Sequence, residues 1–405
     1  MFKILTIFGT RPEAIKMAPV INELERYPNE IELCVCVTGQ HREMLDQVLS
    51  IFNIKPDIDL NIMKNNQSLT EISTRSLSRV TRIMDKIKPD LVLVQGDTTS
   101  AMSAALAAFY KKIPLGHIEA GLRTKDRYSP FPEEINRRMI SALSTYHFAP
   151  TNTAVNALLN EGFCEDDINL TGNTVIDALL AVVRSQKSEV REKAFEEYFK
   201  KRWDLTLAQN TNNLKLILVT GHRRENFGDG FEHICFALKE IAVSNPDVMI
   251  IYPVHLNPNV QRPVREILNG VKNIHLIDPL DYETFVFLMS RSYLILTDSG
   301  GIQEEAPSLG KPVIVLRRVT ERPEAVEAGT VRLVGTDKDR IVSETLSLLN
   351  DSALYSQMST AHNPYGDGKA SERIVEFIKN NCHNFNNRKI KRVEIESVQS
   401  CSALK

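Results

Sequence analysis

The chain has 405 residues, of which 42% are hydrophobic and 25% are charged, and its formal net charge is −2 at pH 7. This length exceeds what one hydrophobic core usually holds, so we expect two domains. The near balance of charge gives no indication of a nucleic-acid or membrane partner. No apolar stretch reaches the roughly 20 residues that a membrane-spanning helix needs. An anionic ligand must therefore be bound by local basic side chains and backbone N–H groups.

The amino terminus begins with a short apolar run that leads directly into polar residues, unlike a secretory signal peptide. The six cysteines show no paired spacing. Cys34 and Cys36 alternate within an apolar run, as is typical of small core residues in a reducing compartment. We therefore expect a cytoplasmic protein.

In the first half of the chain, short apolar runs alternate with segments of helical periodicity. The runs are Lys3–Phe8, Ile31–Val37, Asp90–Gln95, Ile113–Ile118 and Tyr146–Ala149. Nearly continuous Val, Ile and Leu residues are typical of parallel strands buried on both faces. The pattern predicts a Rossmann-like α/β domain over residues 1–172.

The second half repeats this alternation and predicts another Rossmann-like domain over residues 173–365. Its runs are Leu214–Thr220, Val248–Val254, Asn273–Ile277, Tyr293–Thr297, Lys311–Leu316 and Thr330–Val334. A further helix is expected over 366–381. Residues 382–405 lack a sustained pattern, which predicts a disordered tail.

Unusual polar segments follow the apolar runs. They are GTRPEAIK, GDTTS, HIEAGLRT, TGHRREN, PVHLNPN, DPLDY and TDSGG. In open α/β sheets, ligands bind outside the carboxyl ends of the strands. These segments therefore predict one cleft between the two domains.

The segment TDSGGIQEEAP follows a strand and opens a helix, which indicates a phosphate site. Ser299, Gly300 and Gly301 would present backbone N–H groups at the helix start, where the helix dipole favours anions. One of Glu304 and Glu305 is explained by the favourable interaction of an acidic side chain with the helix dipole in the first turn. The other is a candidate acceptor for hydrogen bonds from ribose hydroxyls. The segment matches neither a Walker loop nor G-x-G-x-x-G, which argues against a P-loop NTPase or a classical dehydrogenase.

Basic residues follow the carboxyl ends of strands in both predicted domains, and together they are able to neutralise a diphosphate. They are Arg11, Lys16, His222, Arg223, Arg224 and Arg322. Two cations at one helix start, Arg11 and Lys16, oppose the helix dipole, so a bound anion explains them better than helix stability does.

Carboxylates collect at the ligand side of the first domain. Asp97 either acts on a ligand or caps the next helix. Glu119 ends an otherwise apolar strand, where a buried carboxylate needs partners or a raised pKa, as general acids and bases have. Glu133 and Glu134 share the first turn of a helix, so one of them is expected to be only a dipole or N-cap partner.

A metal site is not expected, although His117 and Glu119 share a strand face and His222 and His255 end other strands. The sequence has no H-E-x-x-H and no paired Cys–His spacing. It also lacks the G-x-S-x-G elbow of serine hydrolases.

Taken together, these motifs resemble the bacterial non-hydrolysing UDP-N-acetylglucosamine 2-epimerase family, from Phe8 to about Lys379. The matching segments are GTRPEAIKMAP, QHREMLDQV, GDTT, HIEAGLRT, TGNTVIDAL, HRREN, YPVHLNPNV, TDSGGIQEEAPSLGKPV, TERPEAVEAGTVRLVGTD and NPYGDG. The resemblance implies a GT-B architecture, two Rossmann-like domains with the 366–381 helix returning to the first. It also implies reversible conversion of UDP-N-acetylglucosamine (UDP-GlcNAc) to UDP-N-acetylmannosamine (UDP-ManNAc) for bacterial surface polysaccharide. The resemblance further implies that the enzyme needs no cofactor or metal and that it forms a homodimer.

The resemblance also assigns roles to individual residues. The catalytic set is Asp97, Glu119, Glu133 and His222. The substrate-binding set is Arg11, Lys16, Phe285, Ser299, Gly300, Gly301, Glu305 and Arg322. A second, regulatory substrate site would include Gln40, Glu43, Arg224 and His255, together with Glu133. Asn66 stands where the family carries an Arg at that site, so we expect weak or absent activation by UDP-GlcNAc.

Some positions depart from the family pattern. Leu280 stands where some members carry Gln, Gln95 replaces a frequent His, and Arg318 replaces a frequent Asp. Three alternatives stay open at this point: a GT-B glycosyltransferase, a hydrolysing epimerase that releases free ManNAc and UDP, and a non-catalytic sugar-nucleotide sensor.

Overall fold

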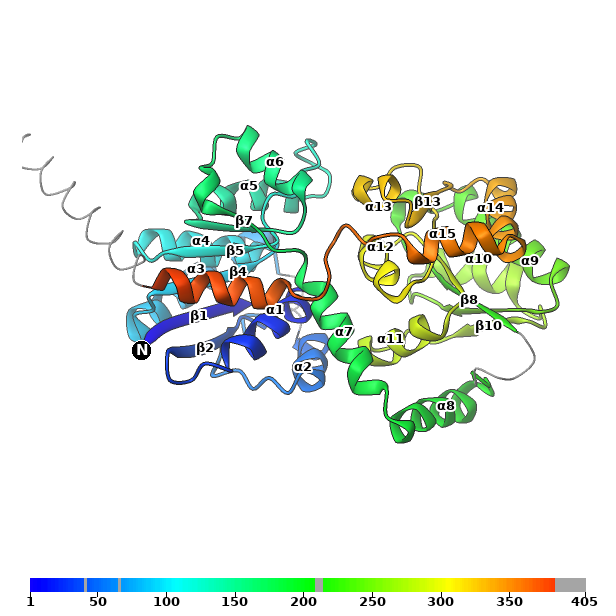
Figure 1. The fold of residues 1–405 in the computed structure, drawn as a ribbon, viewed down its shortest axis with the longest axis horizontal. Helices are drawn as coiled ribbons and strands as arrows, with labels where there is room; N and C mark the ends of the chain where they lie inside the picture. The colour runs from blue at the N-terminus through cyan, green and yellow to red at the C-terminus, as the bar shows by residue number, and fades with distance from the viewer. Residues whose placement is uncertain (40–41, 65–66, 208–213, 383–405) are drawn as a thin grey trace, which may run out of the picture. The chain divides into compact units, whose positions relative to one another are not determined.

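The computed structural model describes residues 1–39, 42–64, 67–207 and 214–382 (Figure 1). These residues divide into two compact units. Unit 1 contains Met1–Ala178 and the chain from Tyr365 onward, and unit 2 contains Leu179–Pro364. The predicted disordered tail lies, from residue 383 on, outside the described residues.

Unit 1 is built on a seven-stranded sheet in the order β3-β2-β1-β4-β5-β6-β7. Every strand pair in it is parallel. The strands are β1 (Phe2–Phe8), β2 (Ile31–Val37), β3 (Ile58–Asp59), β4 (Leu91–Gln95), β5 (Leu115–Ile118), β6 (Tyr146–Ala149) and β7 (Ile168–Leu170). The strand order reverses direction between β1 and β4, which is the switch point where ligands bind in such sheets.

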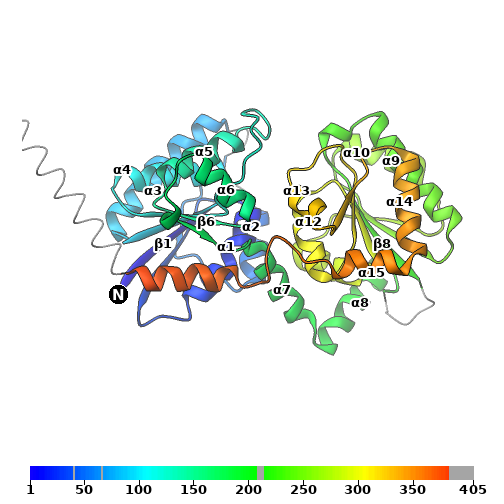
Figure 2. The ribbon, with the colours of Figure 1, turned by 45° about the horizontal axis from the view of Figure 1, so that its top comes forward.

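Helices cover both faces of this sheet (Figure 2). They are α1 (Arg11–Leu24), α2 (Arg42–Ile51), α3 (Leu69–Ile87), α4 (Thr99–Tyr110), α5 (Glu133–Leu143) and α6 (Asn152–Asn160), with a 3₁₀ turn at Glu165–Asp167. One core cluster joins β1, β2, β4 and β5 to α3, α4 and α5. Within it, α4 presents mostly Ala and Ser side chains, so its backbone approaches the sheet closely.

Unit 2 has a six-stranded sheet in the order β10-β9-β8-β11-β12-β13, again with parallel pairs throughout. Its strands are β8 (Lys215–Thr220), β9 (Val248–Pro253), β10 (Ile274–Ile277), β11 (Leu294–Thr297), β12 (Val313–Val315) and β13 (Val331–Leu333). Its longer helices are α8 (Glu189–Trp203), α9 (Asp229–Ser244), α10 (Pro258–Leu268), α11 (Tyr282–Arg291), α14 (Lys338–Asn350) and α15 (Ser352–Thr360). Short helices are α12 (Gly300–Glu305) and α13 (Pro323–Glu327), with 3₁₀ turns at Arg224–Asn226 and Ala306–Leu309. The switch point of this sheet lies between β8 and β11.

The predicted fold class of two Rossmann-like parallel sheets is confirmed, and each predicted apolar run contains a strand. The strands β3 and β7 were not predicted. Both lie at sheet edges and are two and three residues long, without the buried apolar run on which the prediction relied.

The chain passes from unit 1 to unit 2 within α7 (Thr174–Gln186), later than the boundary predicted after Gly172. The first turn of α7 stays with unit 1 because Asp177 binds the returning chain there. Its carboxylate accepts hydrogen bonds from the Ser371 amide at 2.8 Å and the Ser371 hydroxyl at 2.6 Å. It also accepts from the Ala370 amide at 3.2 Å. Asp177 therefore caps the helix that begins at residue 370.

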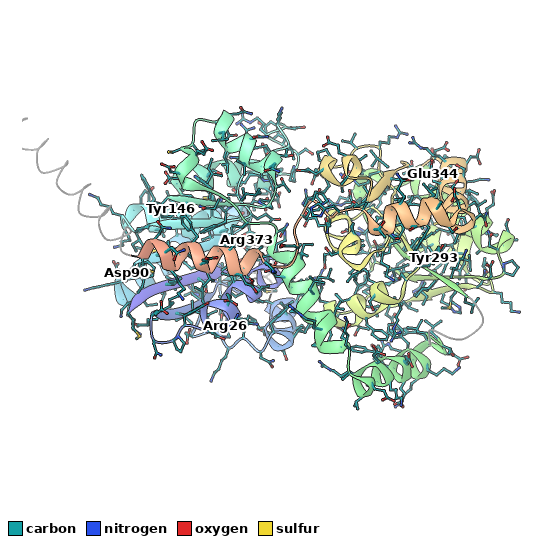
Figure 3. The ribbon with its side chains drawn as sticks, viewed as in Figure 1. Arg26, Asp90, Tyr146, Tyr293, Glu344 and Arg373 are labelled. Atoms are coloured by element: carbon teal, nitrogen blue, oxygen red, sulfur yellow. The ribbon has the colours of Figure 1, made fainter. Side chains whose placement is uncertain are left out.

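That helix, residues 370–382, packs on unit 1 as expected. Phe377 meets Tyr146 and Phe148 edge-on, with ring centroids 5.2 and 5.6 Å apart. Arg373 binds the Thr171 carbonyl oxygen at 2.9 Å, beside the point where the chain leaves the sheet (Figure 3). Aromatic packing and this polar contact together hold the last described helix to β6 and to the residue that follows β7.

A pair of buried histidines predicts how stability depends on pH. His117 and His147 are register partners on β5 and β6, and burial lowers their pKa values to about 3 and about 4. Below pH 6.5 the unfolded chain binds protons that the folded chain excludes, so stability falls as the pH decreases. For His147 alone, the loss between pH 6.5 and about 4 is roughly 3 kcal/mol.

His147→Leu removes one of these titrating groups and should reduce the drop in Tm between neutral and acidic pH. Thermal unfolding of the variant and the parent across this pH range measures the difference. His233→Gln, at an exposed position on α9, is the control and should leave the pH dependence as in the parent. An identical dependence for His147→Leu and the parent would contradict the prediction.

Candidate active site

In unit 1, the carboxyl ends of β1, β4 and β5 bring most of the predicted site residues of this half together. These three strands are neighbours in the sheet, and each ends at a predicted site segment. Lys16, Asp97 and Glu119 come from these different segments and interact with one another. Three of the predicted site residues are therefore close together in unit 1.

Glu119 follows β5 in a left-handed backbone conformation, with φ of 66°. Residues other than Gly adopt this region rarely, and such positions collect at functional sites. Its carboxylate accepts hydrogen bonds from the side chains of Lys16, Gln95 and Asn173. The side chain is only 7% exposed. The turn is thus built to hold one carboxylate in a fixed orientation.

The backbone around Glu119 is held by two further contacts. His117, fully buried on β5, makes a 2.7 Å hydrogen bond from its Nε2 to the Gly96 carbonyl oxygen. Since burial lowers the pKa of His117 to about 3, the ring is neutral at pH 7 and donates through this nitrogen. Gly121 has φ of 91°, and a Cβ there would lie 2.3 Å from the Ala154 carbonyl oxygen, so the turn after Glu119 requires glycine.

Asp97 lies in the loop after β4, where Arg137 of α5 binds its carboxylate at 2.6 Å. Desolvation raises the pKa of Asp97; Arg137 opposes this shift, and the nearby Glu119 and Glu133 add to it. The Asp97 side chain does not cap α4, because Thr98 is the N-cap and accepts from the Ala101 amide at 3.0 Å. The capping alternative is therefore excluded for Asp97.

The two glutamates at the start of α5 have different environments. Glu134 is fully buried and accepts from the Thr124 amide at 3.0 Å and from Arg138 Nε at 3.0 Å. Glu133 is half-buried and has no hydrogen bond or ion pair with any residue that the structure describes. Glu134 is thus the structural member of the pair, and Glu133 is the one available to a ligand.

The turn between β1 and α1 is stabilised by a buried glutamate. Glu13 accepts from the Gly9 and Thr10 amides at 3.0 and 2.8 Å, and from the Thr98 hydroxyl at 2.6 Å. It thereby joins this turn to the loop that carries Asp97. Arg11, the first residue of α1, forms no hydrogen bond or ion pair within the described part of the chain. Its guanidinium remains available to an anion.

In unit 2, a buried aspartate organises the site at the switch point. Asp298, directly after β11, is fully buried and accepts from the backbone amides of His222 and Arg223, each at 2.8 Å. Asn226 Nδ2 donates to the same carboxylate oxygen at 3.3 Å and to the Leu316 carbonyl oxygen at 3.1 Å. Asp298 therefore joins the HRREN segment to the glycine-containing loop. Sequence reasoning missed it, although an Asp between a buried strand and two glycines was a usable signal.

The Nδ1 atom of His222 lies 3.3 Å from the other carboxylate oxygen of Asp298. Its ring stacks on exposed His255, with centroids 5.6 Å apart. Burial lowers the pKa of His222, and Arg223 and His255 lower it further against the opposing effect of Asp298. The imidazole is therefore neutral near pH 7, with one nitrogen facing Asp298.

The glycine loop begins α12, with Ser299 as N-cap and Gly300 and Gly301 as the first helical residues. The first backbone amides of a helix have no partner inside it, and here the Ser299 amide donates to Thr297 Oγ1 at 2.9 Å. A Cβ on Gly300 would lie 3.9 Å from Arg223 Nη2, so a guanidinium flanks the loop. This combination of backbone donors and a cation is suited to phosphate oxygens.

The remaining predicted residues of unit 2 lie around α12. Glu304 is buried and is bound by Arg322, so this arginine has a structural partner besides any ligand. Glu305 accepts from the Tyr282 hydroxyl at 2.9 Å. Phe285, on α11, is half-buried rather than part of the core. Glu304 is thus the structural member of this second glutamate pair.

The predicted regulatory site is only partly described. Arg224 and His255 are exposed in unit 2 near His222. Gln40 and Asn66 lie outside the described residues, as does the side chain of Glu43. Within the described ranges, no cluster of three or more His, Cys, Asp or Glu residues is arranged to hold a metal ion. None of the helices described is both long and apolar enough to cross a membrane.

The chain thus has two parallel-sheet α/β domains of the GT-B type, the first with a cluster of carboxylates and the second with a glycine-containing loop at the switch point of its sheet. A sequence model of the UDP-N-acetylglucosamine 2-epimerase family matches residues 22–379. The UDP-N-acetylglucosamine 2-epimerase of Escherichia coli K12 is 58% identical over 383 residues, which cover 94% of this chain and 99% of that protein.

Solved structures agree with this match. The UDP-GlcNAc 2-epimerase of Neisseria meningitidis, bound to UDP-GlcNAc, has a TM-score of 0.85 and 54% identity, covering 94% of this chain and 100% of that chain. The enzyme of Methanocaldococcus jannaschii, in complex with UDP-GlcNAc and UDP, has a TM-score of 0.75 and 36% identity, covering 93% and 99%. The chain belongs to the UDP-N-acetylglucosamine 2-epimerase family and is an isomerase, which confirms the family predicted from the motifs.

Proposed function

We propose that this chain converts UDP-GlcNAc reversibly to UDP-ManNAc by inverting C2, without net hydrolysis and without a redox cofactor or metal. The proposal is supported by family membership and by the substrate bound to the N. meningitidis relative. The single observation that carries it is Glu119, a buried carboxylate held by Lys16, Gln95 and Asn173 beside Asp97. A nucleotide-binding protein without acid–base chemistry has no need of such a cluster.

The C2 hydrogen of the sugar is not adjacent to a carbonyl group, so direct proton abstraction is too slow. We propose that the C1–O bond to UDP breaks first, with its electron pair leaving on the diphosphate. Positive character at C1 then acidifies the C2 hydrogen, and loss of that proton gives 2-acetamidoglucal and UDP. Protonation of C2 on the opposite face and return of UDP to C1 complete the inversion.

The residues of unit 2 are suited to the departing UDP. In this proposal Ser299, the amides of Gly300 and Gly301, and the guanidinium of Arg322 stabilise the diphosphate. Glu305 binds ribose hydroxyls, and Phe285 lies beside uracil. Electrostatic stabilisation by preorganised donors is often the largest contribution to rate enhancement. Arg11 adds a cation from unit 1, and His222, held beside Asp298, is the member of the proposed catalytic set that lies in unit 2.

Proton transfer at C2 belongs to the carboxylates of unit 1. Asp97 is the candidate donor, because burial raises its pKa against the opposing effect of the ion pair with Arg137. Glu119 and Glu133 are the candidate acceptors. Two groups are required because the proton leaves one face of C2 and returns to the other. The family resemblance further supports a homodimer and a role in bacterial surface polysaccharide synthesis.

Incubation of the purified protein with UDP-GlcNAc alone, in D₂O, tests this proposal. We expect UDP-ManNAc carrying deuterium at C2, with traces of glycal and UDP, and the same rate in the presence of EDTA. A glycosyltransferase would need an acceptor, a hydrolysing epimerase would release free ManNAc, and a sensor would form no product. UDP-ManNAc without deuterium at C2 would rule out the elimination route.

A further inference from the structure

Asn173 is a buried polar residue, 3% exposed, at the point where the chain runs from β7 into α7. Its side-chain oxygen accepts from the Val175 amide at 3.1 Å, and its side-chain nitrogen donates to Glu119 Oε1 at 3.1 Å. Because the Val175 N–H is a donor, the oxygen of the amide must face it. The nitrogen of Asn173 is therefore fixed toward Glu119.

The chain passes between the two units twice, once within α7 and once at Tyr365, and we call these two segments the chain crossings. The backbone of Asn173, which lies at the start of the first crossing, is bound to the second. Its amide donates to the Tyr365 carbonyl oxygen at 2.7 Å, where the chain re-enters unit 1. A Cβ on Gly366 would lie 3.5 Å from the backbone nitrogen of Asn173, so the two crossing segments are in close contact. One residue thus contacts Glu119 and both segments through which unit 1 is connected to the rest of the chain.

We propose that Asn173 is a positioning residue for epimerisation, which orients the Glu119 carboxylate through its side-chain amide and fixes that orientation to the two chain crossings. The inference rests on the proposed role of Glu119. Small displacements of a catalytic group lower rates by up to roughly 100-fold, so loss of this contact should reduce kcat by roughly tenfold to 100-fold. KM should change little, because Asn173 is assigned no substrate contact.

Asn173→Asp separates this role from a purely structural one. The variant keeps the side-chain size, the acceptor for the Val175 amide and the backbone bond to Tyr365. It replaces the donor that faces Glu119 by a carboxylate oxygen. Since burial and the neighbouring Glu119 favour the protonated form of the new carboxyl, lowering the pH restores a donor at that place.

We expect kcat of Asn173→Asp to be lowest relative to the parent near pH 8 and to recover progressively toward about pH 5. Asp177→Asn is the matched control in the same helix. It weakens the cap on residues 370 and 371, which also joins the two crossings, but has no contact with Glu119. This control should lower Tm while leaving kcat and its pH profile unchanged.

Glu119→Gln is measured alongside as the reference. If it is inactive while Asn173→Asp has the kcat of the parent, the positioning role is wrong and the proposed function stands. A loss of kcat in Asn173→Asp without recovery at low pH also overturns the positioning role. An active Glu119→Gln variant would instead overturn the proposed role of Glu119, and this inference with it.

Discussion

Replacing Glu119 with Gln is expected to lower kcat by roughly 100-fold or more, the usual cost of losing a general acid or base. The amide has nearly the same shape but cannot accept the C2 proton. Because most of the residues proposed to bind UDP lie in unit 2, the affinity for UDP should be nearly unchanged. Steady-state kinetics with UDP-GlcNAc and calorimetric titration with UDP measure the two quantities separately.

Glu32→Gln is the matched control for this substitution. Glu32 lies on β2 in the same unit, where it forms an exposed ion pair with Lys3 at 3.1 Å. Exposed ion pairs contribute little to stability, so this variant should keep the kcat and UDP affinity of the parent. Comparable activity of Glu119→Gln and Glu32→Gln would remove Glu119 from the proton-transfer step.

The architecture was predictable because its strands are buried on both faces. Runs such as Leu91–Gln95 and Leu294–Thr297 are buried at every residue, and burial of that kind requires an apolar sequence. The edge strands β3 and β7 carry exposed or half-buried residues instead. Their pairing depends on the neighbouring strand rather than on their own composition, so no local pattern reveals them.

The site was predictable as a set of segments but not as a set of contacts. Sequence position places Glu133 and Glu134 on the same helical turn and cannot say which one faces the protein interior. The contacts of Glu134 with the Thr124 amide and Arg138 settle that question. The partners Asn173, Arg137 and Asp298 lie far along the chain from the residues they hold, which is why spacing alone did not identify them.

Replacing Asp298 with Ala is expected to lower Tm and to weaken UDP binding at least tenfold. The side chain is fully buried and accepts from the His222 and Arg223 amides and from Asn226. Each buried donor left without an acceptor costs about 1–3 kcal/mol. The same loss releases the HRREN segment from the glycine loop, and with it the imidazole of His222 and the guanidinium of Arg223.

Differential scanning calorimetry of the whole chain gives the change in Tm, and titration with UDP well below that temperature gives the affinity of the folded variant. Asp339→Ala is the matched control, because Asp339 is an exposed residue of α14 in the same unit, 3.6 Å from Lys338, and should tolerate the change. Asp298→Asn retains one acceptor oxygen, so its Tm should lie between those of the parent and the alanine variant. Unchanged Tm and UDP affinity in Asp298→Ala would show that the glycine loop and the HRREN segment keep their conformations without this carboxylate. Other residues would then have to organise the unit 2 site.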